Sequence, residues 1–271
     1  SNLGSVLMTS GLPYDSDEGR DVCGAITALM HGTANLTSAE LAEAVGTFDC
    51  YEENAEPMQR VMHMHRDAVK DIGSDCPAYL RDAAQSTWDA VIKAGGAHGF
   101  RNAQATVLAP TGTISFMMDC DTTGIEPDLG LCKMKKLVGG GTMMIVNQSV
   151  PRALRRLGYT DAQVTEITAY IDENKTILGA PGLDPKHVSV FACSMGDNPI
   201  HYLGHVKMMA AVQPFISGAI SKTVNMPEEV TVEEVEQLHI DAWQMGVKAI
   251  AIYRDNCKVA QPLSMAKKDD A

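Results

Sequence analysis

The chain has 271 residues, 45% of them hydrophobic, which is enough to bury a substantial core and indicates a globular protein. Its 34 acidic residues outnumber its 22 basic residues, the formal net charge is −12, and no concentrated run of Lys and Arg is present, so we do not expect polymeric nucleic acid as a partner. No segment approaches the roughly 18 to 20 consecutive apolar residues of a membrane span, and the N-terminus lacks a secretory pattern, so we expect no membrane contact and a cytoplasmic location.

The first hundred residues are expected to be mainly helical, because their apolar residues recur at helical spacing. The acidic and hydroxyl residues at positions 15–17 are typical of the start of one helix, and Thr37 with Ser38 is expected to open a second. Pro57 suits the first turn of a third helix. A fourth helix is expected over residues 77–94, where Gly95 and Gly96 would end it.

The pattern changes after residue 102. Residues 103–109 alternate partly and run directly into Pro-Thr-Gly-Thr, which predicts a short strand entering a tight turn, with a helix beginning over residues 114–118. Thr231 opens a later helix with a capping box. The other expected elements are helices over residues 150–157, 161–174 and 202–213 and strands over residues 220–224 and 247–253. Strands that alternate with helices predict an α/β architecture with parallel strands, in a barrel or an open sheet.

The seven cysteines are odd in number, widely scattered and free of any Cys-x-x-Cys pair. This spacing disfavours a zinc ribbon and a disulfide framework. We therefore expect each cysteine to be a small buried apolar residue.

The strongest local signal for function is the turn at Thr111, Gly112 and Thr113. Its glycine permits a close approach to the backbone, two hydroxyls flank the glycine, and the N–H groups that open the following helix favour an anionic oxygen. The turn therefore predicts a phosphate-binding site, whereas the alternative is that its hydroxyls only cap the helix. It is not a P-loop, because no Gly-Lys-Ser/Thr follows at the required spacing.

Two other polar clusters are weaker signals. Residues 119–127 contain three carboxylates and a thiol but lack the ligand pattern of a calcium loop, so we interpret them as a polar connection. His187, His201 and His205 lie close together in sequence but do not form the His-Glu-x-x-His pattern of a zinc protease. We predict no metal site, and we assign no catalytic acid, base or radical residue within the chain.

Two long stretches resemble a known family. Residues 101–115 read Arg-Asn-Ala-Gln-Ala-Thr-Val-Leu-Ala-Pro-Thr-Gly-Thr-Ile-Ser, and residues 118–127 read Met-Asp-Cys-Asp-Thr-Thr-Gly-Ile-Glu-Pro. Both are similar to the substrate-phosphate region of class II ribonucleotide reductases, which depend on adenosylcobalamin. Residues 11–20, 135–141, 146–151, 204–211, 213–227 and 252–258 continue the resemblance, which covers essentially the whole chain.

The resemblance implies part of the ten-stranded α/β barrel of these reductases, with a helical N-terminal portion. It assigns residues 1–265 to the C-terminal part of the barrel domain and leaves residues 266–271 as a polar tail. In the family, a finger loop with an Asn-Pro-Cys-Gly-Glu segment carries the thiyl-radical cysteine. The 271 residues contain no such segment and no thiol after Cys257. We therefore expect the finger-loop segment to be absent and this chain alone to be inactive.

The implied function is that of a portion of a ribonucleoside-diphosphate reductase, which converts ribonucleotides to 2′-deoxyribonucleotides by thiyl-radical chemistry with adenosylcobalamin as cofactor. The implied partners are a ribonucleoside di- or triphosphate and the N-terminal half of the reductase or a complementing chain, and a homodimer is also compatible with the resemblance. The alternative is a non-catalytic nucleotide-binding or structural module derived from such a reductase.

The resemblance also implies where the substrate phosphates bind. The expected phosphate-binding residues are Ala109, Pro110, Thr111, Gly112, Thr113, Ile114 and Ser115. Gly124, Ile125 and Glu126 are expected to shape the same end of the substrate site.

Overall fold

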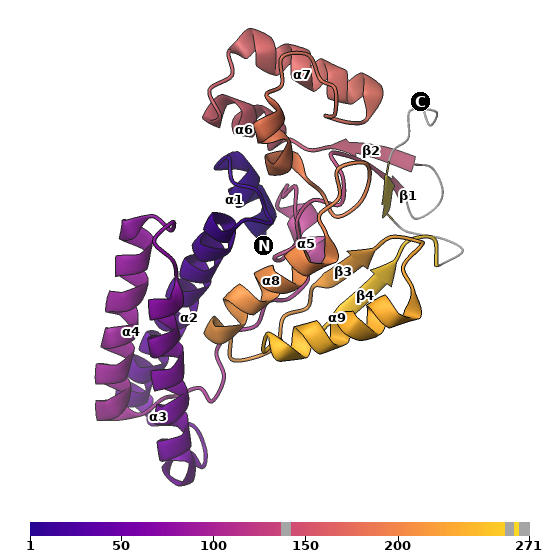
Figure 1. Cartoon of the computed structure of the whole chain (residues 1–271). Helices are drawn as coiled ribbons and strands as arrows, with labels where there is room; N and C mark the ends of the chain where they lie inside the picture. The colour runs from indigo at the N-terminus through magenta and orange to yellow at the C-terminus, as the bar shows by residue number, and fades with distance from the viewer. Residues whose placement is uncertain (137–141, 258–262, 266–271) are drawn as a thin grey trace.

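The computed structural model describes residues 1–136, 142–257 and 263–265. Three long helices form the N-terminal layer, seen from indigo to magenta in Figure 1: α2 (Asp17–Val45), α3 (Tyr51–Ala68) and α4 (Ala78–His98). Ser16 caps α2 by accepting a hydrogen bond from the Gly19 N–H over 3.0 Å, as the polar residues at positions 15–17 predicted. The indole N–H of Trp88 donates to the Ala28 carbonyl, 2.9 Å away, and so links the buried faces of α4 and α2.

Three of the expected helix boundaries in this layer were wrong. Residues 37 and 38 do not open a second helix, because α2 is continuous and the Ser38 hydroxyl bonds to Asn102 instead of capping. Pro57 lies inside α3, which begins six residues earlier at Tyr51. The fourth helix passes through Gly95, whose missing side chain leaves room for the Phe100 ring, and ends at His98, directly before Gly99 with φ of 73°.

The C-terminal half is α/β, as expected. Its helices are α6 (Val150–Arg156), α7 (Asp161–Asn174), α8 (Tyr202–Val212) and α9 (Val232–Gln244), and the short helices α1 (Leu3–Thr9) and α5 (Gly112–Met117) lie near them. Thr231 and Glu234 form the capping box that the sequence predicted: the Glu234 N–H donates to the Thr231 hydroxyl, and the Thr231 N–H donates to the Glu234 carboxylate. Short 3₁₀ helices lie at Val69–Asp71, Pro185–Phe191 and Gln213–Phe215.

The described strands form two small sheets. β3 (Thr223–Met226) and β4 (Ala251–Arg254) pair in parallel, and α9 connects them, which is the βαβ arrangement that the alternating pattern predicted. The other sheet is antiparallel and has the order β2 (Thr142–Val146), β1 (Cys132–Lys136), β5 (Leu263–Met265). β3 begins three residues later, and β4 four residues later, than the sequence predicted.

The expected strand over residues 103–109 was also wrong, because only an isolated parallel bridge between Leu108 and Ile220 forms there. The Thr106 and Leu108 carbonyls accept hydrogen bonds from the Gly218 and Ser221 N–H groups, so this segment still runs beside the approach to β3. The described residues contain five strands, which is consistent with part of an α/β barrel and does not test the expected total of ten. Residues 266–271, expected to be a polar tail, lie outside the described residues. No helix in the described ranges is both long and apolar enough to cross a membrane.

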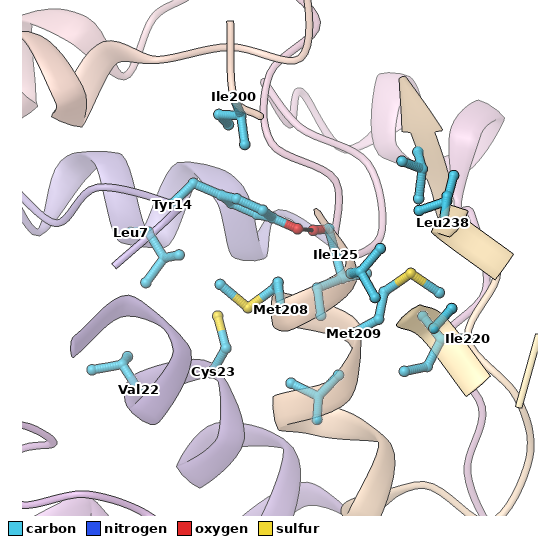
Figure 2. Close-up of a cluster of buried hydrophobic side chains, with 14 of the residues drawn as sticks. Leu7, Tyr14, Val22, Cys23, Ile125, Ile200, Met208, Met209, Ile220 and Leu238 are labelled. Atoms are coloured by element: carbon cyan, nitrogen blue, oxygen red, sulfur yellow. Dashed lines mark hydrogen bonds between the residues drawn. The ribbon is translucent and has the colours of Figure 1, made fainter. Parts of the chain in front are cut away.

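One buried cluster joins the elements around the turn at Thr111. Leu7 of α1, Val22 and Cys23 of α2, and Met208 of α8 pack together with Ile125 (Figure 2). Ile125 is 1% exposed, so the loop that carries Glu126 is anchored in this core. The cysteines are less uniformly buried than expected: Cys23, Cys76, Cys132 and Cys193 are buried, Cys120 is half-buried, and Cys50 and Cys257 are exposed.

Candidate functional site

The turn at Thr111 opens α5, as the sequence predicted. Thr111 takes the left-handed conformation, with φ of 53°, and the chain enters the helix at Gly112. The main-chain N–H groups of Gly112, Thr113 and Ile114 have no acceptor among the described residues, because a first helical turn has no preceding carbonyls to bond. Three donors at the positive end of a short helix are therefore available to an anion.

The hydroxyls of the turn do not all face outward. The Thr111 hydroxyl accepts a hydrogen bond from the Gly124 N–H over 2.7 Å and lies 3.0 Å from the Ser115 hydroxyl. Ser115 is fully buried, and its hydroxyl also lies 2.5 Å from that of Ser1. Thr111 and Ser115 thus hold the turn from behind, whereas Thr113 is exposed.

The other expected residues of the turn are accessible. Ala109, Pro110 and Ile114 are exposed, and Gly112 is half-buried. A Cβ atom at Gly112 would meet no atom within 4 Å, so the space in front of this residue is open.

The loop at Gly124 packs directly behind the turn. Gly124 has φ of 50°, and a Cβ atom there would lie 2.7 Å from the Ala109 carbonyl oxygen, so only glycine fits this close approach. The next residue, Ile125, is held through its carbonyl, which accepts a hydrogen bond of 2.8 Å from the Tyr14 hydroxyl (Figure 2). Burial, with the nearby Glu126 carboxylate as a second cause, raises the pKa of Tyr14 well above its usual value. Tyr14 therefore remains a neutral donor.

Glu126 forms a salt bridge with Lys222. The Lys222 ammonium lies 2.6 Å from one carboxylate oxygen, and the Thr223 N–H donates to the other oxygen over 2.7 Å. The Lys222 side chain is completely buried, and that of Glu126 is 20% exposed. Burial lowers the pKa of Lys222 from its usual value, and the Glu126 carboxylate opposes this shift. Both oxygens of Glu126 are thus engaged by the segment that leads into β3.

A pocket of about 450 Å³ opens beside the turn. Phe116 of α5, Glu126, Asn225 of β3 and Tyr253 of β4 contribute to its walls. The residues from Ala109 to Ser115, and Gly124 and Ile125, do not line it. The expected phosphate-binding turn and the pocket are therefore neighbours, and among the residues expected to form the site Glu126 is the one that reaches the pocket.

A second buried salt bridge lies under the same pocket. The Lys133 ammonium is 2.6 Å from the Asp128 carboxylate and also donates to the Asp121 carbonyl over 3.1 Å, while Asn147 donates to the second Asp128 oxygen. Burial raises the pKa of Asp128 from its usual value, although Lys133 opposes the shift. Within the described ranges, no group of three or more His, Cys, Asp or Glu side chains is arranged to hold a metal ion.

Comparison with known proteins identifies the family. The model of the ribonucleotide reductase barrel domain matches residues 1–253. The chain belongs to this family. It is 59% identical over its whole length to a vitamin B12-dependent ribonucleotide reductase of Rhodopirellula baltica, of which it covers 26%, and 56% identical over its whole length to one of Streptantibioticus cattleyicolor, of which it covers 46%. A vitamin B12-dependent ribonucleoside-diphosphate reductase of Mycobacterium tuberculosis is 29% identical over 97% of the chain, which covers 32% of that protein.

The chain thus spans roughly a quarter to a half of the reductases that it resembles. The turn at Thr111 was predicted from the sequence, but Lys222 and Tyr14 were not assigned to the site. They hold the loop at residues 124–126, which packs against this turn. The spacing between Lys222 and Glu126 is 96 residues, so no local pattern links the two. The position of Lys222 in the middle of the strand predicted over residues 220–224 was the available signal, since a buried lysine needs a partner.

Proposed function

We propose that the chain supplies the substrate-phosphate site of an adenosylcobalamin-dependent ribonucleotide reductase, an enzyme that converts ribonucleotides to 2′-deoxyribonucleotides. The single observation that carries the proposal is the open first turn of α5, where the N–H groups of Gly112, Thr113 and Ile114 have no acceptor among the described residues. The family of the chain and the names of its relatives support the reaction class.

In this proposal the residues of the turn have different tasks. The N–H groups of Gly112, Thr113 and Ile114 bind phosphate oxygens, and the exposed Thr113 hydroxyl adds a further hydrogen bond. Thr111 and Ser115 keep the turn in place through their mutual hydrogen bond. The neighbouring pocket is large enough for a nucleoside, and its wall includes Glu126, which shapes that end of the site.

The cofactor would supply the radical chemistry when bound. Pockets of about 450, 660 and 430 Å³ lie in the described part of the chain, and none of them encloses a ligand of the size of a cobalamin. The described residues do not fit the cofactor by themselves, so we assign no cofactor contact to them. The thiyl-radical cysteine and the remaining barrel strands are proposed to come from the N-terminal half of the reductase or a complementing chain.

The test is a calorimetric titration of the chain with ADP, a ribonucleoside diphosphate. Gly112→Val should weaken binding strongly, because its side chain would occupy the open space where the phosphate approaches. Thr113→Val should reduce the free energy of ADP binding by about 1.5 to 3 kcal/mol, the contribution of one hydrogen bond to a charged group. Gly96→Val is the matched control, since Gly96 has equally open surroundings but lies in α4. Equal affinity of the parent and both turn variants, all folded, would mean that the turn only caps α5.

A further inference from the structure

We propose that Lys222 is a positioning residue for the phosphate-binding turn and that it acts through Glu126. This inference rests on the proposed function, because it concerns how the same site is held in shape. Lys222 touches no residue from 109 to 115 through any hydrogen bond described by the structure; it reaches them through the loop at Gly124.

The first step is the fixation of Glu126. Its carboxylate accepts hydrogen bonds from the Lys222 ammonium at 2.6 Å and from the Thr223 N–H at 2.7 Å. The same ammonium donates to the Thr223 carbonyl over 2.5 Å. A completely buried lysine has no water to replace these contacts, so its side chain is held in one place. The pair therefore fastens Glu126 to the segment that leads into β3.

The second step carries this fixation to the turn. The N–H of Glu126 donates to the Thr123 carbonyl over 2.8 Å and closes a tight turn around Gly124. The N–H of Gly124 in turn donates to the Thr111 hydroxyl, 2.7 Å away. Because Gly124 also packs against the Ala109 carbonyl, a shift of the loop must move the residues on either side of Pro110.

The position of Thr111 matters for anion binding. Thr111 holds a left-handed conformation that a threonine rarely adopts, so the surrounding contacts must stabilise it. Its hydroxyl bonds to Gly124 and Ser115 are the described side-chain contacts that do so. Release of Gly124 would let Thr111 relax toward ordinary angles, and the free N–H groups after it would then point away from a common centre.

The test combines two measurements on the full 271-residue chain: amide hydrogen exchange and calorimetric titration with ADP. Lys222→Met should increase the exchange of the hydrogen-bonded amides in residues 111–117 and 122–126, such as those of Ser115, Gly124 and Glu126, by about tenfold. Exchange in α9 should be unchanged, because the loss of the pair opens this region locally. The same variant should raise the dissociation constant of ADP by about tenfold, measured at a temperature at which the variant is folded. Lys207→Met is the matched control, since Lys207 is an exposed lysine of α8 and its replacement changes the net charge equally.

Glu126→Gln and the double variant guard against a simple loss of folding. Glu126→Gln leaves an acceptor for the Thr223 N–H but strands the Lys222 charge, so it should also increase exchange at the turn. The double variant, Lys222→Met with Glu126→Gln, removes both charges and so leaves no unpaired charge. Its exchange in residues 111–117 should return at least half-way to that of the parent. Unchanged exchange in residues 111–117 in both single variants, or unchanged ADP affinity despite increased exchange, would overturn the positioning role. If the parent itself binds no ADP, the proposed function fails, and the exchange result still decides whether Lys222 holds the turn.

Discussion

Two glycines of the candidate site should respond in opposite ways to the same added methyl group. Gly124→Ala places a side chain on a residue with φ of 50°, and the new Cβ atom would lie 2.7 Å from the Ala109 carbonyl oxygen. The left-handed conformation alone costs about 1 to 3 kcal/mol for a residue with a Cβ atom, and the displaced carbonyl adds to this cost. Gly112→Ala adds its methyl where no atom lies within 4 Å, at a helical position, and should stabilise the chain by about 0.4 to 1 kcal/mol.

Urea unfolding of the purified chain, followed by circular dichroism, measures both effects. The free energies of unfolding of the two variants should differ by at least about 1.5 kcal/mol, with Gly124→Ala the less stable. Gly96→Ala serves as a control, because Gly96 lies in a helix with open surroundings, far from the turn. Equal stability of Gly124→Ala and Gly112→Ala would refute the close approach between the Gly124 loop and the turn, and with it the coupling that the site depends on.

Three further predictions follow from burial, strand edges and the missing segment. Burial lowers the pKa of His31 to about 3 and holds that of His205 well below its usual value, so both histidines are neutral when folded and gain a proton on unfolding below about pH 6.5. The free energy of unfolding should therefore fall by about 1 kcal/mol between pH 6.5 and pH 5.5 for His31 alone. Urea titrations that show no such fall would contradict this. The two-stranded parallel sheet has unpaired edges, and α9 exposes large side chains such as Trp243, which is 76% exposed. The chain should therefore self-associate or require the N-terminal half of the reductase. A monomer by light scattering that also unfolds cooperatively and binds little hydrophobic dye would count against this. The 271-residue chain, supplied with adenosylcobalamin, a dithiol and ribonucleotide, should form no deoxynucleotide, since it contains no Asn-Pro-Cys-Gly-Glu segment, and product formation would overturn that expectation.

Elements with local signals could be predicted from the sequence. The capping box at Thr231 belongs to residues that touch each other within one turn, so the start of α9 was predicted correctly. A short helix after the Pro110-Thr111 turn was also predicted, although α5 begins at Gly112, two residues before the expected start at Ile114.

Elements decided by distant contacts could not be predicted in the same way. The Ser38 hydroxyl looked like a helix cap, but Asn102 binds it from 64 residues away, and α2 continues. The Gly95 position looked like a helix end, but its small size is used to pack Phe100. The same limit applies to the site, where the turn was visible in the sequence and its support by Lys222 was not.

The most direct test of the central claim is a crystal structure of the chain, or of a reductase assembled with it, in complex with ADP. We expect phosphate oxygens within hydrogen-bond distance of the N–H groups of Gly112, Thr113 and Ile114, with the nucleoside directed into the pocket that Glu126 lines. A nucleotide bound elsewhere, with the first turn of α5 facing solvent, would contradict it.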